Sequence, residues 1–126
     1  MIDGIGIDII NVKRKERWVK TRGLVERFFN PDELAEALSR GKAASLSLAS
    51  RFAAKEAFGK AAGSGLAGIV LKDIMVRNRH NGQPEIQVCG TAKKALEKFG
   101  SVKIHVSLTH ERENAVAVVV IEYENN

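Results

Sequence analysis

The sequence predicts an α+β domain in which a mostly antiparallel sheet packs against one long helix. The helix is expected to begin near Ser45 or Ser47 and to end at Gly63, a residue that tolerates the left-handed conformation in which helices often end. Alternating apolar residues predict strands near both ends of the chain, over residues 2–10 and 102–109.

Composition places the chain among globular proteins. Hydrophobic residues make up 44% and charged residues 28% of the 126 residues, which argues against disorder and suits one domain over residues 1–126. The core of so short a chain is small, so oligomerisation would stabilise it. A single cysteine, Cys89, excludes an internal disulfide and suits a reducing compartment. Because we find no signal peptide and no apolar run of membrane-spanning length, we expect the cytoplasm as the location.

The net charge of +5 arises in one segment. Residues 11–27 hold seven basic and two acidic side chains, whereas the charges in the remainder of the chain balance. Such a segment favours an acidic partner, which could be nucleic acid, an anionic membrane or an acidic protein. A solvated helix without a partner is the alternative.

The first predicted strand, over residues 2–10, separates two kinds of side chain. Isoleucines occupy one face, and the other face carries two glycines followed by an aspartate, Gly4, Gly6 and Asp8. Glycine inside a strand commonly marks the close approach of a backbone or a ligand. Asp8 is therefore a candidate ligand at the end of a cleared face, and capping of the next helix is its alternative role.

Short elements account for most of the remaining chain. Asn30 is the predicted N-cap of a helix that begins at Pro31. Asn81 and Gly82 form a pair that is favoured in tight hairpins. The other predicted elements are a basic helix over 11–21, hairpin strands over 69–79 and 84–89, a helix over 91–99 and a strand over 115–123. The last of these is apolar on both faces, so we expect a central strand that is covered on both sides.

The long helix carries a face that changes from apolar to charged. Leu48, Phe52, Glu56 and Lys60 are spaced by four residues and therefore share one side of the helix. A carboxylate set into an apolar stripe is costly to bury unless it is paired or binds a metal ion. An ordinary helical ion pair between Glu56 and Lys60 is the alternative.

Asp8 and Glu56 are the strongest pair of candidate metal ligands. Two carboxylates, together with phosphate oxygens of a substrate and water, suit Mg²⁺. Zinc is disfavoured because one cysteine and three scattered histidines lack ligand spacing. A covalent nucleophile is disfavoured because Cys89 and Ser107 have no clear triad partner.

Other side chains suit an anionic ligand. Lys60 is placed to neutralise charge that develops on a phosphate, and Arg14 and Arg51 could add to this. The strand over 102–109 presents a row of hydroxyl and imidazole groups on one face, for which a plain solvated face is the alternative. This row comprises Lys103, His105, Ser107 and Thr109, with His110 at its end.

Three motifs together resemble one enzyme family. They are the start GIGIDII over residues 4–10, the block RFAAKEAFGKA over 51–61 and the closing HVSLTH over 105–110. Their order and spacing are similar to those of holo-[acyl-carrier-protein] synthase, the small bacterial 4′-phosphopantetheinyl transferase, and the resemblance covers nearly the whole chain. Asn11 departs from the pattern, because many relatives carry an acid there.

The resemblance implies a reaction, an assembly and a set of roles. Coenzyme A would donate 4′-phosphopantetheine to a serine of apo acyl carrier protein in fatty acid biosynthesis, releasing adenosine 3′,5′-bisphosphate. The 4′-phosphopantetheinyl transferase fold would form a homotrimer with active sites between subunits. Asp8 and Glu56 would bind Mg²⁺ with the pyrophosphate, and Lys60 would stabilise charge on the phosphates or the leaving group. The serine proton would pass to Glu56 or to a metal-bound water.

The resemblance also suggests how the nucleotide is held. Residues expected to bind the nucleotide part of coenzyme A are Arg51, Ser107, Thr109 and His110, whereas His105 is either a ligand contact or a structural residue.

The basic segment would provide a docking surface for the acidic carrier protein. Its candidate residues are Arg14, Arg17, Lys20 and Arg22. A nucleic-acid-binding protein is a rival interpretation, although aromatic residues make up only 6% and a recognised nucleic-acid motif is lacking. A non-catalytic interaction domain is the second rival.

Overall fold

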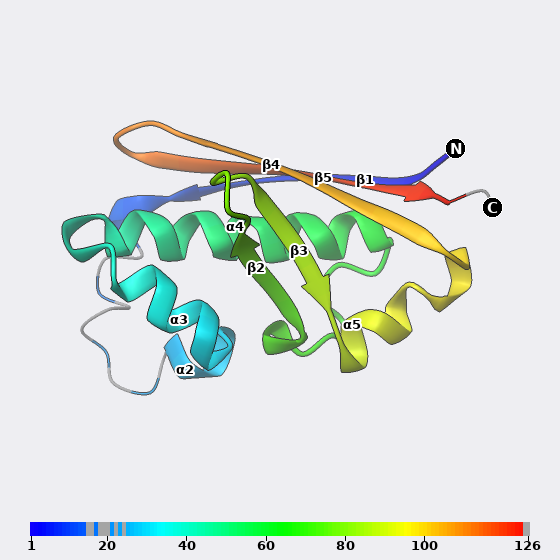
Figure 1. The fold of residues 1–126 in the computed structure, drawn as a ribbon, viewed down its shortest axis with the longest axis horizontal. Helices are drawn as coiled ribbons and strands as arrows, with labels where there is room; N and C mark the ends of the chain where they lie inside the picture. Colours follow the sequence, from blue (N-terminus) through cyan, green and yellow to red (C-terminus); the bar gives the residue numbers. More distant parts are fainter. Residues whose placement is uncertain (15–16, 18–20, 22, 24, 125–126) are drawn as a thin grey trace.

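The chain forms two antiparallel sheets around one long helix in a computed structural model that describes residues 1–14, 17, 21, 23 and 25–124 (Figure 1). The strands are β1 (Ile2–Asn11), β2 (Ile74–Asn78), β3 (Pro84–Val88), β4 (Val102–His110) and β5 (Asn114–Tyr123). One sheet has the order β1-β5-β4, and β2 pairs with β3 in a second sheet. The predicted α+β class with antiparallel strands is confirmed, but the hairpin forms its own sheet.

The long helix is α4 (Ala44–Ala62), which spans 19 residues and contributes to the core that both sheets share. It ends at Gly63, which is left-handed with a φ of 89°, so the predicted C-terminus is confirmed. Alanines along α4 pack against apolar side chains of β5, while Ile74 and Val76 of β2 contribute to the same core. The helix therefore joins the three-stranded sheet to the hairpin.

Two glycines allow β1 to lie directly against the backbone of α4. A Cβ atom on Gly6 would lie 2.0 Å from the carbonyl oxygen of Ala57, and one on Gly4 would lie 1.9 Å from that of Ala61. These distances are far shorter than any carbon–oxygen contact, so a side chain at either position would separate the strand from the helix. The predicted reason for glycine in this strand is confirmed, and the same face carries Asp8 toward α4.

The shorter helices are α2 (Val25–Phe28), α3 (Pro31–Leu38) and α5 (Gly90–Ala95). Asn30 caps α3 as predicted: its side chain accepts a hydrogen bond from the backbone N–H of Asp32, and Glu33 accepts one from the backbone N–H of Asn30. This reciprocal capping fixes the start of α3.

Two predicted elements differ from the structure. The strand over 69–79 is wrong at its start, since Leu71–Asp73 form a 3₁₀ turn before β2. The helix over 91–99 is shorter than predicted, and Glu97–Phe99 form a separate 3₁₀ turn. The predicted basic helix over 11–21 is described in part: residues 12–14 and 17 are helical, whereas 15, 16 and 18–20 lie outside the described residues. The side chain of Asn11 accepts a hydrogen bond from the backbone N–H of Arg14.

The central strand β5 is covered on one side only within the described chain, so a single chain does not supply the second cover that the sequence predicts. Its inward residues Ala117, Val119 and Ile121 are fully buried, whereas the alternate valines are partly exposed. Three isoleucines of β1 lie beside these valines and are exposed by 59–66%: Ile5, Ile7 and Ile9. We define the outer face as Ile5, Ile7, Ile9, Val116, Val118 and Val120.

A carboxylate outside the hairpin caps α5. Asp73 Oδ2 accepts hydrogen bonds from the backbone N–H and the hydroxyl of Thr91, at 2.8 and 2.6 Å. These bonds lower the pKa of Asp73. The thiol of Cys89 lies 3.6 Å from Asp73 Oδ1, and partial desolvation together with this carboxylate raises the pKa of Cys89.

In the part of the chain that the structure describes, the helices fall short of the combined length and hydrophobicity that crossing a bilayer requires.

Candidate active site

A lysine from α4 joins the helix to the end of β1. The Nζ atom of Lys60 lies 3.1 Å from Asp8 Oδ1 and donates a hydrogen bond to the carbonyl oxygen of Ile7 at 3.0 Å. Glu56 precedes Lys60 by one helical turn, so both project from the same flank of α4. The structure thus places Asp8 beside the helical flank that carries Glu56 and Lys60.

The second oxygen of Asp8 has a different environment. Asp8 Oδ2 is buried and has no hydrogen-bond partner among the described residues. A buried carboxylate oxygen without a partner costs free energy, and a cation would remove this cost. Clusters of three or more metal-binding side chains do not occur among the described residues, so a cation here would take further ligands from water or substrate. This pattern fits Mg²⁺ better than a closed zinc site.

The first half of α4 lines a cleft of about 480 Å³ between the helix, the hairpin and the end of β4. Its walls include Ser47, Ser50 and Arg51 of α4, Val76, Asn78 and Pro84 of the hairpin, and Leu108 and His110 of β4. Arg40 and Arg51 bring positive charge to this lining, and His110 adds an imidazole. The cleft therefore suits an anionic ligand with an apolar part.

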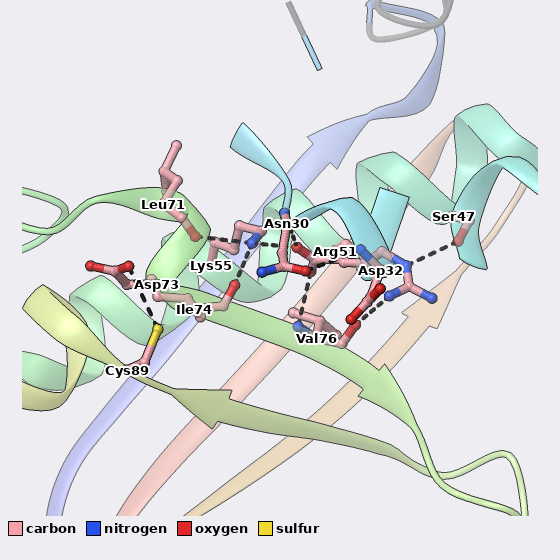
Figure 2. Close-up of polar contacts among 11 residues, drawn as sticks. Asn30, Asp32, Ser47, Arg51, Lys55, Leu71, Asp73, Ile74, Val76 and Cys89 are labelled. Atoms are coloured by element: carbon pink, nitrogen blue, oxygen red, sulfur yellow. Dashed lines mark hydrogen bonds and ion pairs between the residues drawn. The ribbon is translucent and has the colours of Figure 1, made fainter. Parts of the chain in front are cut away.

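Arg51 is almost fully buried and holds several elements together (Figure 2). Its Nε atom donates to the hydroxyl of Ser47 at 3.2 Å, Nη1 donates to the carbonyl oxygen of Val76, and Nη2 lies 3.3 Å from Glu36 Oε1. The sequence predicts Arg51 as a nucleotide ligand. In the structure, Arg51 lies in the cleft wall, and each of its three side-chain nitrogens contacts another residue of the protein.

The polar row of β4 divides between two sides of the sheet. His110 shares the side of Leu108 and lines the cleft, as expected for residues two apart in a strand. Ser107 and Thr109 are exposed and alternate with these residues, so they lie on the same side of the sheet as the outer face. Within one chain, the structure does not bring Ser107 and Thr109 together with His110.

His105 lies on that same outer side and has a structural partner. Its Nε2 atom lies 2.9 Å from Glu122 Oε1 of β5, and this hydrogen bond lowers the pKa of Glu122. This contact joins β4 to β5 and is a structural role for His105. The sequence left open whether this residue is structural or contacts a ligand.

The predicted docking residues are described in part. Arg14 and Arg17 are exposed, whereas Lys20 and Arg22 lie outside the described residues.

Sequence reasoning misses two groups of polar residues. Glu33 and Lys55 form a fully buried ion pair with 2.9 Å between Oε1 and Nζ. Burial lowers the pKa of Lys55, and the carboxylate of Glu33 opposes this effect. A lysine amid alanines on a helix could have suggested burial, but its partner is 22 residues away. Arg40 lines the cleft, and the local sequence gives no sign of this position.

Comparisons with known proteins match one family over nearly the whole chain. The family model described as "4′-phosphopantetheinyl transferase superfamily" matches residues 4–119. The chain is 57% identical over 122 residues to a holo-[acyl-carrier-protein] synthase of Treponema denticola, covering 97% of this chain and 99% of the relative. A crystal structure of the synthase from Neisseria meningitidis has a TM-score of 0.85 and 39% identity, covering 97% of this chain and 99% of that chain. The Bacillus anthracis synthase in complex with coenzyme A (3′,5′-ADP) has a TM-score of 0.83 and 36% identity, covering 98% and 99%.

Proposed function

The chain belongs to the holo-[acyl-carrier-protein] synthase family of 4′-phosphopantetheinyl transferases, and we propose that its transfer reaction depends on Mg²⁺. In this proposal, 4′-phosphopantetheine passes from coenzyme A to a serine of apo acyl carrier protein, and adenosine 3′,5′-bisphosphate is released. The observation that carries the proposal is the position of Asp8, whose one oxygen contacts Lys60 while the other is buried without a partner among the described residues. We assign the reaction to the cytoplasm and to fatty acid biosynthesis, the process that uses acyl carrier protein.

Asp8 and Glu56 would hold the metal ion, in agreement with the partnerless oxygen of Asp8 among the described residues. When bound, Mg²⁺ supplies positive charge that neutralises the pyrophosphate of coenzyme A. Because only two carboxylates of this chain take part, the phosphate oxygens and water would complete the coordination.

The remaining chemistry belongs to the chain's own side chains. The serine oxygen forms a bond to the phosphorus that carries the pantetheine arm, and the bond from this phosphorus to the bridging oxygen breaks. The electron pair of that bond leaves with adenosine 3′,5′-bisphosphate. Lys60 is 52% exposed although Asp8 and Ile7 hold it, so its ammonium can stabilise charge on the phosphate oxygens. Glu56 and water are the two candidate acceptors of the serine proton.

The cleft beside the first half of α4 would hold the nucleotide part of coenzyme A. Arg51 and His110 line it, and Arg40 adds a further positive charge. The related B. anthracis synthase forms a complex with coenzyme A (3′,5′-ADP), which supports a nucleotide site in this fold. Ser107 and Thr109 lie on the other side of β4, so their predicted contact with coenzyme A requires a site that includes the outer face of a subunit.

A homotrimer would cover that outer face. The isoleucines of β1 and the neighbouring valines of β5 form a continuous apolar surface on the described chain. Exposed apolar surfaces of this kind commonly mark interaction sites. In a homotrimer with active sites between subunits, these residues would be buried and Ser107 and Thr109 would lie near a neighbouring subunit.

Replacing Ile7 by lysine is expected to convert the trimer to monomers and to lower transferase activity. The ammonium would have to be buried at the centre of the outer face, where Ile7 is now 59% exposed in the single chain. Light scattering coupled to gel filtration would measure the mass against three times the chain mass of 13.8 kDa. Val70→Lys, an equal change at an exposed apolar residue elsewhere, serves as the control. A monomeric wild-type protein would contradict the assembly.

The carrier protein would dock on the basic segment that includes Arg14, Arg17, Lys20 and Arg22. The excess of seven basic over two acidic side chains at residues 11–27 suits an acidic partner and association that weakens with salt.

Reversing the charge of Arg14 and Arg17 to glutamate is expected to raise the KM for carrier protein about tenfold, while kcat changes little. Both side chains are exposed, so the substitution should leave the core intact. Steady-state kinetics at two salt concentrations would measure the effect. Lys93→Glu with Lys94→Glu changes the charge equally on α5 and should leave this KM unchanged. Equal effects of the two double variants would refute docking at the basic segment.

A direct assay tests the proposed function. The protein would be mixed with apo acyl carrier protein, coenzyme A and Mg²⁺, and mass spectrometry would look for the added phosphopantetheine. We expect the product with Mg²⁺ and its loss when a chelator is present. If the product is absent and the protein instead shifts DNA or RNA in a salt-dependent gel assay, the nucleic-acid-binding alternative is favoured.

A further inference from the structure

The strand β2 has one edge that pairs with β3 and another that faces α3 and α4. In an antiparallel pair, successive residues direct their backbone groups to opposite edges. Val76 directs both its N–H and its carbonyl oxygen away from β3, and Ile74 directs its carbonyl oxygen the same way. An unpaired strand edge of this kind requires hydrogen-bond partners when it is buried.

Three charged side chains supply these partners in place of a neighbouring strand. Figure 2 labels two of them, Arg51 and Lys55. Glu33 Oε2 accepts a hydrogen bond from the backbone N–H of Val76 at 2.9 Å. Arg51 donates to the carbonyl oxygen of Val76, and Lys55 donates to that of Ile74. We define the edge clamp as Glu33, Arg51 and Lys55.

The edge clamp is buried and internally connected. Glu33 and Lys55 are 0% exposed and contact each other at 2.9 Å. Oε1 of Glu33, the oxygen that contacts Lys55, also accepts a hydrogen bond from the backbone N–H of Asn30 at 3.2 Å. Lys55 in turn donates to the carbonyl oxygen of Leu71 at 3.0 Å. Because a buried charge is tolerated only with partners in good geometry, the three elements that meet here have little freedom to move apart.

The clamp also adjoins the cleft. Val76 and Arg51 both line it. The backbone N–H of Val76 donates to Glu33, and its carbonyl oxygen accepts from Arg51. Beyond Val76, the hairpin continues as the wall formed by Asn78, Gly82 and Pro84. The buried side chains of the edge clamp therefore set the distance between α4 and the hairpin wall of the cleft.

We propose that Glu33 and Lys55 are positioning residues that set the width of the nucleotide cleft by holding the free edge of β2 against α4. The inference rests on the proposed function, because the ligand of this cleft is the nucleotide part of coenzyme A. It assigns to Lys55, which neighbours Glu56 in sequence, a role in binding coenzyme A rather than in the chemistry of phosphoryl transfer.

Two variants with a matched control test this role. Glu33→Gln keeps the shape of the side chain but removes the charge that pairs with Lys55. The double variant Glu33→Leu with Lys55→Met replaces the ion pair by apolar side chains, so that no buried charge is left unpaired, while the backbone groups of Ile74 and Val76 lose these partners. Glu85→Gln makes the same chemical change as Glu33→Gln on the hairpin itself, where Glu85 forms an exposed pair with Arg79.

The readouts are the KM for coenzyme A, kcat, and the Kd for adenosine 3′,5′-bisphosphate measured by calorimetry, with circular dichroism as a check of folding. We expect KM and Kd to rise together by about tenfold in the folded variants, with kcat changed about twofold or less, because the clamp bonds to α3 and β2 whereas Asp8 and Lys60 bond to each other. Glu85→Gln should match the wild type. Unchanged KM and Kd in a folded double variant would overturn the inference.

Hydrogen exchange of the unmodified protein provides a test that does not depend on variant stability. The amide of Val76 should exchange as slowly as the core amides of β5 even without a ligand. Exchange as fast as that of the hairpin turn would also overturn the inference. If the wild type transfers phosphopantetheine but the double variant keeps its KM and Kd, or the amide of Val76 exchanges fast, only the inference is contradicted. If the wild type does not transfer phosphopantetheine, the proposed function is contradicted.

Discussion

Replacing Asp8 by alanine is expected to lower kcat for phosphopantetheine transfer by about 10² to 10³-fold. The substitution removes a proposed ligand of Mg²⁺ and the carboxylate that lies 3.1 Å from the ammonium of Lys60. Without Asp8, the site would lose the charge of Mg²⁺, and the ammonium of Lys60 would lose the carboxylate that positions it. Less positive charge would then face the phosphates as negative charge develops on them. Single-turnover measurements at saturating coenzyme A and carrier protein would isolate this effect from binding.

The effect should be specific to the end of β1. Asp32→Ala removes an exposed carboxylate from the first turn of α3 and should leave kcat at the wild-type value. The affinity for Mg²⁺, measured by calorimetry in the presence of adenosine 3′,5′-bisphosphate, should fall in Asp8→Ala. If Asp8→Ala retains both the Mg²⁺ affinity and the kcat of the wild type, Asp8 is not a ligand of the metal ion and does not contribute to the transfer.

Replacing Gly6 by alanine should lower the free energy of unfolding by about 3 kcal/mol or more. The new methyl group would lie 2.0 Å from the carbonyl oxygen of Ala57 and 2.8 Å from the backbone nitrogen of Ala61. Since both contacts are with helix backbone, no side chain can rotate to relieve them, and β1 must move away from α4. A decrease in Tm of about 10 to 20 °C would correspond to this loss.

A second alanine substitution separates this clash from the general cost of losing glycine. Gly41 has a φ of 58° and a Cβ atom there would meet no atom within 4 Å, so Gly41→Ala should cost only about 1 kcal/mol. Thermal unfolding of both variants would give the comparison. Equal stabilities would mean that β1 and α4 are not packed as closely as the structure indicates. Because β1 carries Asp8, we also expect Gly6→Ala to reduce transfer in whatever fraction remains folded.

Local signals explain why much of this fold could be predicted. The glycines of β1 predict a close contact, and Gly63 and Asn30 predict the ends of two helices, because each position requires a residue with special backbone or capping properties. The candidate site follows the same logic at Asp8 and Lys60, where strand alternation and helical spacing fix the direction of the side chains.

Features that depend on distant partners could not be predicted. Lys55 looks like a surface lysine until α3 brings Glu33 beside it. The valines of β5 suggest a strand covered on both sides, but composition does not reveal whether the second cover is part of the same chain. Ser107 and His110 are close in sequence, and the pleat of β4 nevertheless places them on opposite sides of the sheet.

The carboxylate that caps α5 has a practical consequence for labelling. Thiols react with maleimides and iodoacetamide as thiolates, and Asp73 together with partial desolvation raises the pKa of Cys89, so this thiol stays protonated to a higher pH than an ordinary cysteine. A cysteine introduced at an ordinary surface position would therefore be modified first at neutral pH.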